Sequence, residues 1–557
     1  MSSLADRAAA SFAETEAAVG TSPIGPIGQL KVPALGTSRA VASSHPAISA
    51  VGAQVLAEGG NAVDATLAMA AMGWMVLPGQ CGIGGDAFAL VREPDGRVWT
   101  VNGSGYGPDG GTPDFYRERG LDAIPSAGPL SVTVPGAPAA LATLARSATR
   151  ELADLWAPAV DAAERGVPAT AKNIADIAEK QRELTADAEA AEVFLPEGRL
   201  PRLGEPIRQT ALARTIRALA DDPRTFYNGS FAELAIDTLT AAGAPFSGDE
   251  WRLGSDAPMT DAITGAYRGA TLYQTPSPSA GWMVLHQAAL LDGVLGDLDQ
   301  LGPEAIHWLA GAARASFQHR FDYCATDNDH WRTALGPSAI RRTRRAIIRG
   351  LPTAAPPGLT VAGDTTSTVC VDAEGRAVSF IHSLAFTFGA RMMVPSTGVM
   401  LGDRLGRGAY LIQGHPNEVR PRRKPMHTLN AWLVDRPDGL VCVGNCPGGD
   451  GQVQWNMQVI SHLLDHGDDP QRAVSLPRVT VFPGSDADTI GRAPIIRCEA
   501  GIDEDTLTTL ERWGHTIERT PVQRGGPGGS ALAITTDKYG VLHAAADPRM
   551  EGIALAL

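Results

Sequence analysis

The sequence has few of the residues that mark a disulfide framework, a metal site or a nucleic-acid surface. Its 557 residues include only six cysteines, which are scattered and show no framework or CxxC-pair spacing. The HExxH and GxxxxGK[ST] motifs are absent, so neither a metal nor a cofactor is predicted. The formal net charge is −14 and there is no long basic run, which argues against nucleic acid and anionic membranes as partners.

Long apolar runs are also missing. The most apolar helix candidate, residues 62–77, carries Asp64, ends before Pro78 and is short for a membrane span, so we interpret it as a buried core helix. The first residues mix acidic and basic side chains and lack an apolar stretch, which argues against a secretory signal. We therefore expect a soluble, cytoplasmic protein.

Two β-rich segments, residues 366–371 and 377–388, are separated by a turn signal at 372–375, which predicts a hairpin. The breaker-rich residues 351–363 before it predict an exposed, irregular loop. Thr365 therefore stands where a loop enters a strand. If the bond before it were cut, Thr365 would become an N-terminal nucleophile, with its own α-amine, of pKa about 7.7–8.0, as the base. The alternative is that Thr365 is simply a β-forming residue.

A second candidate site follows the predicted strand 439–444. There a glycine-rich turn, residues 445–451, leads into a predicted helix at 452–466. Free N–H groups at such a helix start can bind an anion or stabilise an oxyanion. Cys446 also has the G-x-nucleophile-x-G spacing of a nucleophile elbow, and His462 follows it in the chain. Against that hypothesis, Pro447 has no N–H to donate to an oxyanion.

The remaining chain predicts a mixed α/β protein. Helices are expected at 46–58, in several segments of 130–240, including 174–191, and at 303–324. The glycines at 82–85 precede a predicted strand, whereas the glycines of a dinucleotide-binding fingerprint follow a strand and open a helix. Nucleotide binding is therefore not predicted.

Several stretches, taken together, resemble the γ-glutamyltransferase family of N-terminal-nucleophile hydrolases. They run in the family's order from about residue 40 to the end: residues 42–46, 58–65, 82–85, 128–136, 364–372, 447–449 and 546–549. The resemblance implies a four-layer αββα sandwich made as one precursor. The precursor would be cut into a large subunit, residues 1–364, with a helical excursion at about 137–330, and a small subunit, residues 365–557, which stay together.

The resemblance also implies roles for individual residues. Thr365 resembles the family's nucleophile, and Gly448 and Gly449 resemble its oxyanion-hole glycines. Ser383 stands where the family has a hydroxyl that supports the nucleophile's amine. The resemblance leaves open whether two such subunit pairs form a dimer.

The substrate-binding positions depart from the family's pattern. Ser104, near Asn102, stands where the family's carboxylate-binding arginine is expected, and Arg407 stands where an aspartate would bind the substrate's α-amine. His427 and Thr428 replace a pair of serines. A γ-glutamyl donor would lose both anchors, so glutathione is not the expected substrate.

Local sequences at 102–105, 379–383, 414–417, 424–430 and 448–452 resemble a divergent branch of the family that includes oxamate amidohydrolases and homologues in alkyl-proline antibiotic pathways. Substrates of that kind carry a carboxylate beside the carbon attacked, and Arg404 or Arg407 would suit it. We therefore predict a self-processing threonine hydrolase that acts on an amide of a small anionic substrate. Two alternatives stay open: a C–C bond hydrolase that releases an oxalyl-type fragment, and an unprocessed, inactive homologue that acts as a binding protein.

Overall fold

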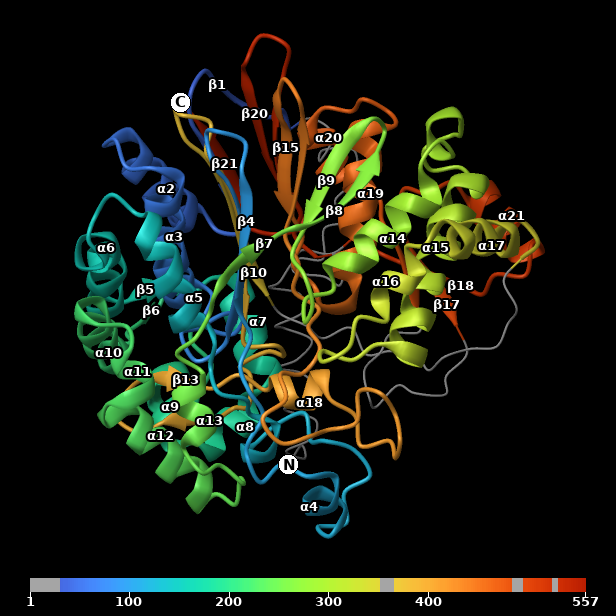
Figure 1. The fold of residues 1–557 in the computed structure, drawn as a ribbon. Coiled ribbons are helices and arrows are strands. Elements are labelled where there is room, and N and C mark those ends of the chain that lie inside the picture. The colour runs from blue at the N-terminus through green and yellow to red at the C-terminus, as the bar shows by residue number, and fades with distance from the viewer. Residues whose placement is uncertain (1–30, 351–364, 483–493, 523–528) are drawn as a thin grey trace, which may run out of the picture.

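The computed structural model describes residues 31–350, 365–482, 494–522 and 529–557; the predicted loop at 351–363 lies outside them. Within these residues, two seven-stranded antiparallel sheets pack face to face, with helices on both outer faces (Figure 1). The first sheet has the order β1 (Ala34–Gly36), β20 (Leu542–Ala546), β19 (Leu532–Thr536), β15 (Gly439–Asn445), β14 (Trp432–Arg436), β9 (Ala270–Gln274) and β8 (Ile263–Tyr267). The second has the order β21 (Ile553–Ala556), β2 (Ala40–Ser43), β10 (Thr366–Val371), β11 (Ala377–Ser383), β3 (Asp86–Arg92), β4 (Val98–Gly103) and β7 (Met259–Asp261). The predicted αββα sandwich is confirmed.

The predicted hairpin is the centre of the second sheet. Strands β10 and β11 pair antiparallel, with Thr366 opposite His382. Successive side chains of a strand point to opposite faces. Val369 and Val371 accordingly pack between the two sheets, whereas Cys370 packs into the helical layer. By the same alternation, Thr365 belongs to the face between the sheets.

The apolar helix predicted at 62–77 is α3 (Ala62–Val76), and every one of its residues is buried. The side chain of Asn61 accepts hydrogen bonds at its start, and Asp64 completes a capping box. The helix packs against β10 and β11, and its first N–H donates to the Asp372 carboxylate at 2.9 Å. The prediction of a buried core helix is confirmed, and the helix forms the floor under the hairpin.

The other helical layer covers the sheet that contains β15. It includes α14 (Gly281–Leu291), α15 (Pro303–Tyr323) and α19 (Gln452–Leu464). Strand β15 ends at Asn445, and a 3₁₀ turn, η6 (Gly449–Gly451), leads into α19. The predicted order of strand, glycine turn and helix is confirmed.

Three local predictions are wrong. The helix expected at 174–191 is divided among α7 (Ala171–Glu179), α8 (Gln181–Ala186) and α9 (Ala188–Phe194), because Asp187 is extended and caps α9. The expected helical excursion at 137–330 also contains the strands β7, β8 and β9, of which β7 and β8 lie at the edges of their sheets. Strand β11 ends at Ser383 rather than at 388, since Ala385 has a φ of 86°.

Within the described ranges, no helix is long and apolar enough to cross a membrane. The six cysteines are all buried, and none of them is paired in a disulfide.

Candidate active site

Four polar side chains lie in a row along one end of strands β10, β11, β3 and β4. The register places Ser383 opposite Asp86, and its continuation places Thr365 beside Ser383 and Ser104 beside Asp86. All four are buried, and alternation directs them toward the other sheet. Because neighbouring strands lie about 4.8 Å apart, the row spans roughly 14 Å. We call it the polar row.

Thr365 and Ser383 are in direct contact at one end of the polar row. The Thr365 hydroxyl donates to Ser383 Oγ at 3.1 Å, and the Ala385 N–H donates to the same oxygen at 2.8 Å. Only 6% of the Thr365 surface is exposed. The threonine hydroxyl is therefore held in a fixed position at the start of a central strand.

The glycine turn after β15 adopts a backbone that only glycine tolerates easily. Gly448 has a φ of 132° and Gly449 a φ of 57°. A Cβ atom on Gly448 would collide with the Trp455 ring, and one on Gly449 would collide with the Arg407 guanidinium. The indole N–H of Trp455 donates to Thr480 Oγ1 at 2.9 Å, which fixes the ring. The Trp455 ring thus occupies the space for a side chain at Gly448, and the Arg407 guanidinium occupies the space for one at Gly449.

Arg407 connects the glycine turn to the end of the hairpin. It lies on the short helix α18 (Arg404–Gly408), and its Nη1 donates to the Ala385 carbonyl at 3.5 Å. Its guanidinium carbon lies 4.5 Å from the centre of the Phe386 ring. A cation that contacts both Gly449 and the segment after Ser383 lies where the candidate nucleophile and the candidate oxyanion site converge.

Arg404 lies one helical turn away from Arg407 and is 1% exposed. Its Nε donates to Asp86 Oδ2 at 3.2 Å. Neither Nη1 nor Nη2 has a hydrogen-bond partner among the described residues. Burial raises the pKa of Asp86, and the charge of Arg404 opposes that rise. Buried donors without acceptors are costly, and a guanidinium fork matches a carboxylate, so these two nitrogens are candidates to bind a carboxylate.

His427 and Thr428 are both buried, and His427 lies beside this ion pair. The His427 ring packs edge-on against Phe88, with centroids 4.9 Å apart, and its Nε2 lies 3.4 Å from Asp86 Oδ2. Burial lowers the pKa of His427 well below its ordinary value, and the nearby Arg404 lowers it further. His427 is therefore neutral near pH 7. The Thr428 carbonyl accepts from the Asn430 amide at 3.1 Å.

Ser104 and Asn102 lie at the other end of the polar row. The Ser104 N–H donates to Asn102 Oδ1 at 3.0 Å, while Ser104 Oγ is buried and has no partner among the described residues. The next N–H, of Gly105, donates to Asp86 Oδ1 at 3.1 Å. The structure therefore places Thr365, Ser383 and Ser104 in the polar row, with Arg404 and His427 against Asp86.

Sequence reasoning missed Asp86, Lys424 and the Arg320–Asp450 pair. Asp86 is the first residue of a strand whose residues are all buried. A charged residue directly after two glycines, at the start of an apolar strand, was a signal that could have identified it as a site residue. Burial lowers the pKa of Lys424, and its charge acts on both Asp86 and His427. Arg320 donates to Asp450 at 2.9 Å with both side chains buried, which ties α15 to the glycine turn. No sequence pattern joins residues that far apart.

The structure does not favour Cys446 as a nucleophile. Its side chain is fully buried, and burial raises the pKa of the thiol to about 12. A nucleophilic cysteine needs its thiolate, which is scarce at neutral pH with such a pKa.

Replacing Cys446 by serine is therefore expected to leave chain cleavage intact and to retain most of the activity, at a small cost in melting temperature. Denaturing electrophoresis and a turnover assay measure both. A soluble, folded Cys446→Ser protein without turnover would restore the elbow hypothesis.

No group of three His, Cys, Asp or Glu side chains in the described residues could hold a metal ion. The described residues bring together a buried hydroxyl, a glycine turn and two neighbouring arginines. The two facing sheets with helices outside have the αββα architecture of N-terminal-nucleophile hydrolases.

The chain belongs to the γ-glutamyltransferase family: the family model described as Gamma-glutamyltranspeptidase matches residues 48–557. It is 31% identical over 535 residues to a glutathione hydrolase-like YwrD proenzyme of Bacillus subtilis, covering 94% of this chain and 99% of the relative. It is 31% identical over 532 residues to an oxamate amidohydrolase proenzyme of Klebsiella pneumoniae, covering 92% and 97%. The crystal structure of a cephalosporin acylase from Bacillus halodurans matches with a TM-score of 0.85 at 27% identity, covering 95% of this chain and 97% of that one.

Proposed function

We propose that this protein is a self-processing threonine hydrolase that cleaves an amide whose scissile carbonyl is bonded to a carboxylate, as in oxamate. The precursor is cut before Thr365, so that residues 1–364 and 365–557 become the two subunits. Relatives named as proenzymes, one of them an oxamate amidohydrolase, support this proposal.

The position of Arg407 carries the proposal. Its guanidinium occupies the space where a Cβ atom on Gly449 would lie, and it hydrogen-bonds to the segment that follows Ser383. The N–H of Gly449 is the candidate oxyanion donor. In an oxamate the carboxylate carbon is bonded directly to the scissile carbonyl, about 1.5 Å away. A cation beside the oxyanion site is therefore placed to bind a carboxylate that is bonded directly to the scissile carbonyl.

Arg404 supports the same choice of substrate. Residues three apart on a helix are neighbours, so a carboxylate between Arg404 and Arg407 can accept hydrogen bonds from both guanidinium groups. It would accept from Nη1 and Nη2 of Arg404, which have no partner among the described residues. Arg391 and Arg404 are paired with Asp403 and Asp86. Lys424 adds a positive charge that acts on Asp86, which favours an anionic substrate.

The mechanism follows from these positions. The Thr365 α-amine accepts the proton of its own hydroxyl as Oγ bonds to the scissile carbon, and the N–H groups of Gly448 and Gly449 donate to the developing oxyanion. The C–N bond then breaks, and the proton passes to the departing amine. Water adds to the resulting ester, the C–Oγ bond breaks, and the dicarboxylic acid leaves with Thr365 regenerated.

The same residues would serve a C–C bond hydrolase that releases an oxalyl-type fragment, because such a substrate presents the same carboxylate to Arg407. A panel of carboxylate-bearing amides and 2,4-dioxo acids, assayed on the purified protein, separates the two reactions by their products.

The proposal predicts a reversed substrate preference relative to a glutathione hydrolase. Ser104 has no guanidinium for an α-carboxylate, and Arg407 repels an α-ammonium. Each lost charge-assisted contact costs about 1.5–3 kcal/mol, so kcat/KM for oxamate should exceed that for γ-glutamyl-p-nitroanilide and glutathione at least about 100-fold. Efficient hydrolysis of glutathione would contradict the proposal. A folded protein that hydrolyses nothing in the panel would favour a binding protein.

A further inference from the structure

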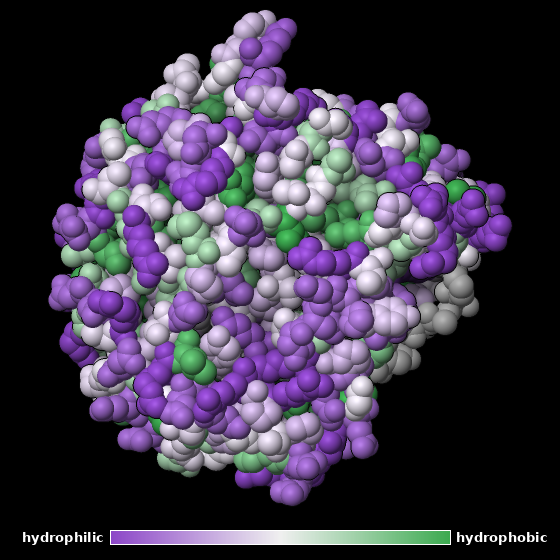
Figure 2. All heavy atoms as spheres, viewed as in Figure 1, coloured by the Kyte–Doolittle hydropathy of each residue, from purple (hydrophilic) through white to green (hydrophobic). Residues whose placement is uncertain are grey.

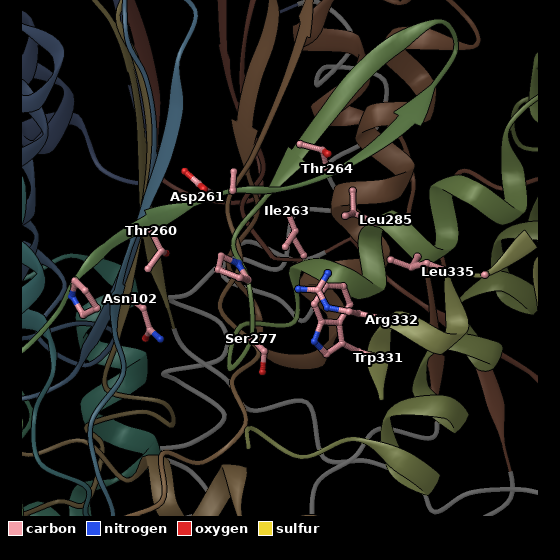
Figure 3. Close-up of a pocket in the computed structure, with 14 residues that line it drawn as sticks. Asn102, Thr260, Asp261, Ile263, Thr264, Ser277, Leu285, Trp331, Arg332 and Leu335 are labelled. Atoms are coloured by element: carbon pink, nitrogen blue, oxygen red, sulfur yellow. The ribbon is translucent and has the colours of Figure 1, made fainter. Parts of the chain in front are cut away.

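A groove opens between the edges of the two sheets, and Asn102 is the one residue of the candidate site that lines it. It has a volume of about 770 Å³ and is lined by strands β4, β7 and β8, by the turn before α14, and by α16 (Trp331–Ala334) and the residues after it (Figure 3). Small-molecule sites in proteins have volumes of about 300–1,000 Å³. In Figure 2 apolar residues gather in a hollow of this face, over β8 and α14, among hydrophilic surroundings.

The lining of the groove mixes apolar and polar side chains, and Asp261 and Arg332 add one charge of each sign. Ile263, Pro276 and Leu335 supply half-exposed apolar surface. Trp331, which is 4% exposed, lies with its ring toward Ser277, and its indole N–H has no hydrogen-bond partner among the described residues. Such a surface suits an apolar group with one hydrogen-bond acceptor.

The groove adjoins the end of the polar row that lies farthest from Thr365. Asn102 lines the groove, and it precedes Ser104 by two positions on the same face of the sheet. Behind Trp331 and Ser277 a smaller cavity of about 10 Å³ reaches His427, which lies 3.4 Å from Asp86. This cavity holds about one water molecule, so no passage for a substrate runs through that wall.

We propose that the groove receives the apolar amine part of an N-substituted oxamate, which makes long-chain or arylalkyl oxamates the substrate class of this enzyme. This inference rests on the proposed function. The acyl part of an oxamate has only two carbons, and Arg404 and Arg407 hold its carboxylate, so nothing of the acyl part extends further. The part of the substrate that extends from Thr365 to the groove is therefore the amine part. It must span the length of the polar row, roughly 14 Å.

The test compares oxamate, which ends near the arginines, with N-(6-phenylhexyl)oxamate, whose amine is long enough to reach the groove. Wild-type protein should show at least a tenfold higher kcat/KM for the extended substrate. Ile263→Asp and Leu335→Asp should abolish that preference and leave kcat/KM for oxamate within twofold. Both side chains are partly buried and pack against the core, so the melting temperature of each variant is measured beside its kinetics. Leu253→Asp is the matched control, because Leu253 is 44% exposed and lies outside the groove.

Two failures are distinguishable. If oxamate is hydrolysed but the extended substrate gains nothing, or the groove variants leave its gain unchanged, the groove assignment is overturned and the proposed function stands. If neither oxamate is hydrolysed, calorimetry of 6-phenylhexylamine with Thr365→Ala protein decides the groove alone. The groove assignment is supported if the amine binds the Thr365→Ala protein, if adding Leu335→Asp removes that binding, and if adding Leu253→Asp keeps it. If the amine does not bind the Thr365→Ala protein, the groove assignment is overturned.

Discussion

Replacing Thr365 by alanine is expected to give one full-length chain whose hydrolysis of oxamate falls at least about 10⁴-fold, because both the nucleophile and the group that cuts the chain are lost. Thr365→Ser should keep cleavage and part of the activity, since a serine hydroxyl can attack in the same way. Denaturing electrophoresis and a turnover assay on the same preparations measure both effects.

The neighbouring threonine provides the control. The Thr366 hydroxyl points to the opposite face and donates to Gln80 Oε1 at 2.9 Å, away from the polar row. Thr366→Val should therefore be cleaved and remain active, with a loss of stability of about 1 kcal/mol for the broken hydrogen bond. Equal activity in Thr365→Ala and wild type would refute the nucleophile, and equal loss in both variants would point to damage of strand β10.

Replacing Arg404 by methionine is expected to raise KM for oxamate about 10- to 150-fold, which corresponds to one lost charge-assisted contact of about 1.5–3 kcal/mol. Chain cleavage should be unchanged, because Arg404 contacts neither Thr365 nor Ser383 in the hydrogen bonds of the site. Initial-rate kinetics over a range of oxamate concentrations separates KM from kcat.

Removing Arg404 also leaves Asp86 as a buried charge, which can cost about 3–5 kcal/mol of stability. The double variant Arg404→Met with Asp86→Asn removes that charge and should recover the melting temperature without recovering KM. Arg92→Met is the control for loss of a buried arginine, because Arg92 pairs with Asp435 at 2.9 Å at the opposite end of β3. If Arg92→Met raised KM as much as Arg404→Met, the carboxylate site at Arg404 would be wrong.

Features carried by short-range patterns could be read from the sequence. The hairpin of β10 and β11 follows from β-forming residues around a turn, and α3 follows from an apolar run behind the Asn61 cap. The turn between β15 and α19 follows from its glycines. The family resemblance added Ser383, Gly448 and Gly449, which local propensity alone does not single out.

Features that depend on sheet order could not be read in this way. The polar row exists because β11 pairs with β3 and β3 with β4, which brings Asp86 beside Ser383 and Ser104 beside Asp86. The empty donors of Arg404 depend on how α18 folds over that row. The groove requires the edges formed by β7 and β8 to meet the residues around Trp331, and no spacing along the chain encodes that meeting.

The most direct test of the account is to identify the N-terminus of the smaller chain in catalytically active wild-type protein. Peptide mass mapping of protein that hydrolyses oxamate should find two chains, residues 1–364 and 365–557, with a free α-amine on Thr365. A single uncut chain that hydrolyses oxamate at the same rate would contradict the N-terminal threonine mechanism.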